Sequence, residues 1–141
     1  FYRDLGAPGA EVDARAALSL VNDYRAKEGL PPLALDRTLV DLAREEAEAL
    51  AAADSVRLSL AADRALDKRL AAAGFAAGRA VENTSAGYRT LAEAFSGWRD
   101  SGRHDRNMRD PDVDRFGIAT AYAPDSKYRV FWTAIFAESA P

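Results

Sequence analysis

The sequence predicts an α+β domain with a central antiparallel sheet between layers of helices. Apolar residues recur every three or four positions through four segments between residues 11 and 101, as in helices that bury one face. After residue 115 the period changes to two, which is typical of strands. A run of helices followed by paired strands buries its apolar faces when the helices pack on the sheet.

A single domain over residues 1–141 accounts for the whole chain. A chain of 141 residues buries about 70% of its unfolded surface, which is enough for a core of its own. The formal net charge of −3 argues against a nucleic-acid partner, because such domains carry a basic surface. The lack of cysteine excludes disulfides, thiolate metal ligands and cysteine nucleophiles. We expect a monomer.

No segment of the sequence is apolar enough to cross a bilayer. The longest nearly unbroken apolar run, residues 130–137, is far shorter than the roughly 20 residues that a spanning helix needs. Because the chain begins with Phe1 and not with methionine, we expect a preceding segment to have been removed.

The first two helices have clear end signals. Residues 11–28 carry apolar groups on one face, and Gly29 with the prolines that follow it predicts the end of this helix. Asp36 is suited to cap a second helix, in which Glu46 lies near the edge of the apolar face.

Two further helices are expected before the strands. A weaker apolar period predicts a third helix over residues 63–73, and Gly74 followed by Phe75 predicts its end. Thr90 and Glu93 have the spacing of a capping box, which predicts the start of a fourth helix. We expect this helix to end near Ser101, so that His104 lies on a loop.

The last third of the chain predicts a hairpin of strands. Residues 116–122 alternate bulky residues with glycine and alanine, so we expect a helix to pack closely on the small face. Residues 128–136 carry apolar groups on both faces, as a strand covered on both sides does. The turn at residues 123–127 joins the two as an antiparallel hairpin. Residues 80–88 are expected to add an earlier strand or turn.

Seven short fragments, spread over nearly the whole chain, carry a family resemblance. They are residues 21–25 with 29–33, 39 with 43–47, 73–75, 81–83 with 87, 98–101 with 104 and 107, 116–119, and 131–133 with 136. In this order and spacing they resemble the CAP superfamily of cysteine-rich secretory proteins, antigen 5 and pathogenesis-related 1 proteins. The sequence is most similar to the small cysteine-free bacterial branch, whose domains are called SCP-like.

The resemblance implies a three-layer αβα sandwich, an extracellular or periplasmic location, and a surface groove holding two histidines and two acidic residues. Glu82 matches one acid of this set, and His104 matches one histidine. Leu58 falls near the place of the other histidine, and Ser101 stands where many members have the second acid. Glu46 replaces a histidine that is common on the second helix of bacterial members.

The histidine content limits the metal chemistry. A zinc ion bound by nitrogen and oxygen takes about four donors, commonly including two or three imidazoles in catalytic sites. His104 is the single histidine of the chain. Although zinc-dependent behaviour is attributed to some family members, we expect no metal and no other cofactor here. His104 and Glu82 come nearest to a pair of metal ligands.

Two interpretations of Glu82 and His104 stay open. In the first, the carboxylate orients the imidazole of an acid/base pair, with Ser101 or Ser85 as the nucleophile of a Ser-His-Glu arrangement. In the second, a hydrogen bond between the two side chains only fixes the geometry of the segments that carry them.

Other polar residues have structural alternatives as well. Asn22 and Arg25 either form a polar wall of the groove or anchor the loop at residues 29–33. Asn107 is expected to bond to its own backbone in a turn. Both tryptophans lie in apolar periodic runs and are expected in the core.

Three functions are compatible with these observations. The leading hypothesis is a non-enzymatic, exported domain whose groove binds a small or lipid-like ligand, a partner peptide or an envelope protein. The second is a hydrolase of peptide or cell-envelope material, with His104 as general base oriented by Glu82. The third is a purely structural or interaction domain of the envelope. The expected groove residues are Glu82, His104, Ser101, Glu46, Asn22 and Asn107.

Overall fold

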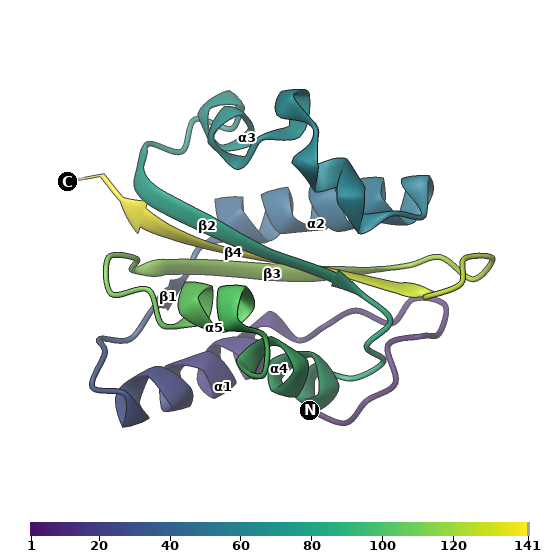
Figure 1. Ribbon diagram of the computed structural model, residues 1–141, viewed down its shortest axis with the longest axis horizontal. Helices are drawn as coiled ribbons and strands as arrows, with labels where there is room; N and C mark the ends of the chain where they lie inside the picture. The colour runs from purple at the N-terminus through teal and green to yellow at the C-terminus, as the bar shows by residue number, and fades with distance from the viewer. Residues whose placement is uncertain (141) are drawn as a thin grey trace.

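In a computed structural model, which describes residues 1–140, a four-stranded sheet forms the middle of three layers (Figure 1). The strand order is β1 (Ala34–Leu35), β3 (Arg115–Tyr122), β4 (Val130–Ser139) and β2 (Ala77–Ala86). β4 runs antiparallel to both of its neighbours, whereas β1 runs parallel to β3. The predicted fold class is confirmed, although the two residues of β1 make the sheet mixed and not wholly antiparallel.

Helices cover both faces of this sheet (Figure 1). On one face, which we call the α2 face, lie α2 (Arg37–Ala53), η1 (Val56–Leu60), η2 (Ala62–Arg64) and α3 (Leu66–Ala72). On the other, the α1 face, lie α1 (Ala14–Lys27), α4 (Leu91–Arg99) and α5 (Gly102–Met108). Each face has its own buried apolar cluster. No helix within residues 1–140 has the length and apolar character needed to span a membrane.

The helix ends follow the signals in the sequence. Asp36 accepts a hydrogen bond from the backbone N–H of Leu39 at 3.2 Å at the start of α2. Thr90 accepts one from the N–H of Glu93 at 3.1 Å at the start of α4. Gly74 follows α3 with a φ of +74°, a conformation that glycine adopts without strain.

The close packing predicted on the small face of β3 is present. A β-carbon at Gly117 would lie 2.3 Å from the backbone carbonyl carbon of Leu39 and 2.4 Å from the backbone nitrogen of Val40. The backbone of α2 therefore approaches β3 so closely that only glycine fits at this position.

One local feature differs from the sequence-based expectation. His104 lies within α5 and not on a loop, because the N–H of Asp105 bonds to the carbonyl of Ser101 at 2.8 Å and starts a new helix. The strand or turn expected over residues 80–88 is a strand, β2, which starts earlier, at Ala77. Its polar side chains have partners on the helices of both faces.

Candidate functional site

β2 sends Glu82 and Asn83 to opposite faces of the sheet. Side chains alternate along a strand, and Val81 packs on the α1 face whereas Ala80 packs on the α2 face. Glu82 therefore points towards the α2 face. Asn83 points towards α5, where its amide donates to the backbone carbonyl of His104 at 3.1 Å.

On the α2 face, Glu82 belongs to a group of polar side chains that we call the ion-pair cluster. Its members are Glu46, Ser59, Arg64, Arg69 and Glu82. Arg69 Nη2 donates to Glu82 Oε1 at 2.6 Å and lies 3.9 Å from Glu46 Oε2. Glu46 is fully buried, and it also accepts hydrogen bonds from Arg64 and, at 2.6 Å, from the Ser59 hydroxyl. The cluster joins α2 and β2 to the segment that contains η1, η2 and α3.

The charges of the cluster balance one another. Burial raises the pKa of Glu82, and the hydrogen bond from Arg69 opposes this rise. The hydrogen bond to Glu46 raises the pKa of Arg64. Two carboxylates and two guanidinium groups leave no formal net charge when all four are ionised. This balance offsets part of the cost of burying them.

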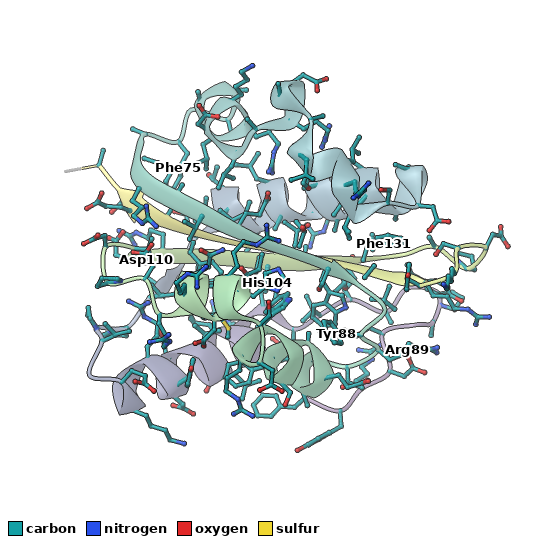
Figure 2. The ribbon with its side chains drawn as sticks, viewed as in Figure 1. Phe75, Tyr88, Arg89, His104, Asp110 and Phe131 are labelled. Atoms are coloured by element: carbon teal, nitrogen blue, oxygen red, sulfur yellow. The ribbon has the colours of Figure 1, made fainter. Side chains whose placement is uncertain are left out.

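His104 lies on the α1 face, on α5 (Figure 2). Its ring centre is 6.4 Å from that of Trp98, and its Nε2 is buried with no hydrogen-bond partner within residues 1–140. Burial lowers the pKa of the imidazole, and the positive charge of Arg103 lowers it further. In the described part of the chain, no hydrogen bond or ion pair joins His104 to Glu82. The structure thus does not bring the expected pair together.

Two asparagines connect α5 to β2. Asn83 is fully buried, and its Oδ1 accepts a hydrogen bond from Asn107 Nδ2 at 2.9 Å. The same Asn107 nitrogen donates to the backbone carbonyl of Glu82 at 3.2 Å. Asn107 was expected to bond to its own backbone, but its side chain faces the edge strand and bonds there. The role of Asn83 was not predicted, although its place two residues after Val81 puts it on the same buried face.

The remaining expected groove residues lie elsewhere. Ser101 is the N-cap residue of α5, and its side chain makes no capping hydrogen bond. Asn22 bonds to the backbone of Leu33 twice, as donor at 3.0 Å and as acceptor at 2.8 Å. Arg25 donates to the carbonyl of Pro31 at 2.9 Å. Both α1 residues therefore anchor the loop that follows the helix.

Comparison with known proteins agrees with this fold. The family model described as "CAP: Cysteine-rich secretory protein family" matches residues 18–136. The chain belongs to the CAP family. No curated protein matches this CAP domain in sequence.

Solved structures with the same fold come from several bacteria. An extracellular SCP-domain protein from Bacillus anthracis has a TM-score of 0.77 and 22% identity, covering 89% of this CAP domain and 40% of that protein. An outer surface protein from Borrelia burgdorferi has a TM-score of 0.76 and 19% identity, and the match covers 92% of this CAP domain and 98% of that protein. The CAP domain of enterococcal PrgA has a TM-score of 0.61 and 17% identity, and the match covers 89% of this CAP domain and 59% of that chain. This CAP domain thus spans about two fifths of the Bacillus protein.

A zinc ion of the kind that the resemblance suggested does not fit this CAP domain. The histidine lies on the α1 face, whereas Glu46 and Glu82 lie on the α2 face and already hold two guanidinium groups. Within residues 1–140, no three His, Cys, Asp or Glu side chains lie close enough together to hold a metal ion. A zinc site built from nitrogen and oxygen takes about four donors.

A groove of about 520 Å³ lies between α3 and the start of β2. Leu70, Phe75, Ala77 and Ala80 supply apolar lining, and Asp67 is the one charged lining residue. Phe75 is seen beside β2 in Figure 2. Two lining residues lie close in sequence to members of the ion-pair cluster, Leu70 beside Arg69 on α3 and Ala80 two positions before Glu82 on β2. None of the six expected groove residues lines this groove.

Proposed function

We propose that this CAP domain is a non-enzymatic binding module that acts outside the cell or in its envelope. We further propose that an extended peptide of a partner protein binds in the groove between α3 and β2. The observation that carries the proposal is the separation of Glu82 from His104, because acid/base catalysis by this pair requires contact between the two side chains. His104 Nε2 is also buried and has no hydrogen-bond partner among the described residues.

The position of the groove supports a peptide as the ligand. β2 is an edge strand, so one of its sides has no neighbouring strand. An extended peptide can bond to such an edge through its main chain while an apolar side chain enters an adjacent pocket. Leu70 and Phe75 provide the apolar contact for that side chain. The volume of about 520 Å³ lies within the range of ligand pockets in proteins.

The location outside the cell is supported by the relatives. The Bacillus protein is described as extracellular, and the Borrelia protein is described as an outer surface protein. We propose the same kind of location for this CAP domain.

Peptide selection tests the proposed function. Peptides selected from a random display library on the wild-type domain would be measured by calorimetry against Ala71→Arg, which places a long side chain in the groove from the exposed side of α3. Ala52→Arg, at an exposed position of α2 that does not line the groove, is the matched control. We expect Ala71→Arg to weaken binding at least tenfold, or about 1.4 kcal/mol, and Ala52→Arg to leave it unchanged.

Two results would contradict this function. Equal affinity of the selected peptides for wild type and Ala71→Arg would exclude the groove. Recovery of a lipid by extraction and mass spectrometry, lost in Ala71→Arg, would instead assign a lipid-like ligand to the same groove.

A further inference from the structure

The groove between α3 and β2 has a negative charge on its wall and no positive one. Asp67 on α3 is its one charged lining residue, and this residue is exposed. Within residues 1–140, the Asp67 carboxylate takes part in no ion pair and accepts no hydrogen bond. It therefore has its full capacity to bind a cationic group of a ligand.

A second carboxylate lies at the β2 end of the groove. Glu138 Oε1 accepts a hydrogen bond from the backbone N–H of Arg79 at 3.0 Å. The Glu138 carboxylate lies against Gly78, which lines the groove. In the described part of the chain, Glu138 forms no ion pair. It thus adds a second negative charge beside the groove.

The cationic side chains near the groove do not neutralise these acids. Arg69 on α3 donates to Glu82 at 2.6 Å, and Arg79 on β2 donates to Asp110. Lys68 on α3 is exposed and does not line the groove. A positively charged ligand therefore matches the groove better than a neutral or acidic one.

The spacing of two lining residues on α3 matches the repeat of an extended peptide. Asp67 and Leu70 are three residues apart on α3, and both line the groove. Side chains at this spacing are neighbours on a helix surface, about 5–6 Å apart between Cβ atoms. In an extended peptide, side chains two positions apart share a face and are separated by roughly 6.6 Å. A peptide with an apolar side chain against Leu70 can thus place a residue two positions away beside Asp67.

We propose that the groove selects a cationic peptide in which a lysine or arginine stands two positions from the apolar residue that enters the groove. The apolar side chain lies against Leu70 and Phe75, and the cationic side chain reaches Asp67. The inference rests on the proposed peptide-binding function and adds the charge and the spacing of the ligand. A basic residue one position from the apolar residue points to the opposite face of an extended chain, so it gains no such contact.

Display selection tests this specificity. Random peptide libraries would be selected on the wild type and on Asp67→Lys, and the recovered sequences compared. We expect lysine and arginine two positions from an apolar residue in the wild-type pool, and aspartate and glutamate there in the Asp67→Lys pool. Asp63→Lys reverses an exposed acid of the same segment that does not line the groove. This matched control should select the same peptides as the wild type.

Calorimetry of a peptide selected on the wild type measures the contact itself. We expect Asp67→Asn to weaken its binding about three- to fivefold, which is the size of an exposed ion pair. Replacing the basic residue of the peptide by alanine should weaken binding to the wild type as much, and should weaken binding to Asp67→Asn no further. This peptide substitution is measured on the wild-type domain, so it tests the contact even where a variant of α3 does not fold.

The outcomes distinguish this inference from the proposed function. Peptides that Ala71→Arg weakens but that show no basic preference would overturn the inferred selectivity and leave peptide binding in the groove intact. The same holds if Asp67→Asn weakens peptides equally whether their basic residue stands one or two positions from the apolar residue. If no selected peptide is weakened by Ala71→Arg, the proposed function fails, and this inference fails with it.

Discussion

The side chains of Glu82 and His104 lie on opposite faces of the sheet, although the residue next to Glu82 bonds directly to the backbone of His104. Glu82 ties β2 to α3 through Arg69. On the other face, Asn83 ties the same strand to α5. Residues that the family resemblance placed in one groove therefore form two separate structural joints on either side of an edge strand.

The lowered pKa of His104 predicts a loss of stability as the pH falls. The unfolded imidazole titrates near 6.5, whereas burial and Arg103 make the folded imidazole harder to protonate. The unfolded state therefore binds more protons below this pH, and protonation draws the protein towards it. This contribution to stability is present above about pH 6.5 and is lost as the pH falls through the folded pKa.

Denaturant titration of wild type and His104→Gln checks this expectation. Between about pH 7.5 and 5.5, where histidine is the main titrating side chain, the wild type should lose more free energy of unfolding than the variant. Equal losses in the two proteins would show that the imidazole titrates normally in the folded state.

The contact between Asn83 and Asn107 predicts coupled losses of stability. Asn83→Ala removes a buried amide that both donates and accepts, so we expect a loss of about 1 to 3 kcal/mol. Asn107→Ala should cost a similar amount. Because the two amides bond to each other, the double variant should lose less than the sum of the single losses. Urea unfolding measures all three, and strict additivity would show that the contact contributes nothing.

Most of the fold could be predicted because its signals are local. Asp36, Thr90 and Gly74 mark helix ends through hydrogen bonds or backbone angles that involve only neighbouring residues. The parallel pairing of β1 with β3 could not be predicted, because two residues are too few to show a period. The helix that restarts at Gly102 could not be predicted, because the sequence around Ser101 indicates only the end of the preceding helix.

The site was harder to predict because it depends on which side chains meet. A difference of one position along β2 decides whether a side chain faces α2 or α5, so Glu82 and Asn83 have unrelated partners. The sequence around Arg64 and Arg69 has only a weak apolar period, so it does not indicate that these two side chains pack against the acids. The indication of the ion-pair cluster in the sequence is Glu46, which lies at the edge of the apolar face of its helix. A buried acid there requires a cationic partner.

The close approach of α2 to β3 predicts that Gly117→Ala is destabilising. The new methyl group would lie 2.3 Å from the backbone of Leu39, and a helix backbone cannot move away as a flexible side chain can. We expect a loss of about 3 kcal/mol in free energy of unfolding, by urea titration. Gly78→Ala is a matched control on β2, because its methyl group would meet only the end of the Glu138 side chain. If Gly78→Ala lost as much free energy of unfolding as Gly117→Ala, the close approach of α2 would not be the cause of the loss.

The burial of Arg25 predicts that this residue is essential for the stability of the α1 face. Its guanidinium group is fully buried and donates to the carbonyls of Pro31, Met108 and Asp110 at 2.9, 3.0 and 2.8 Å. Arg25→Met leaves these three acceptors unpaired, so we expect a loss of roughly 3 kcal/mol or more. Arg25→Lys should recover little of it, because an ammonium group lacks the planar fork that reaches all three. Arg37→Met, at an exposed ion pair on α2, is the control, with an expected loss below about 0.5 kcal/mol. Equal Tm values for Arg25→Met and Arg37→Met would show that the buried hydrogen bonds of Arg25 do not hold the loop and α5 to α1.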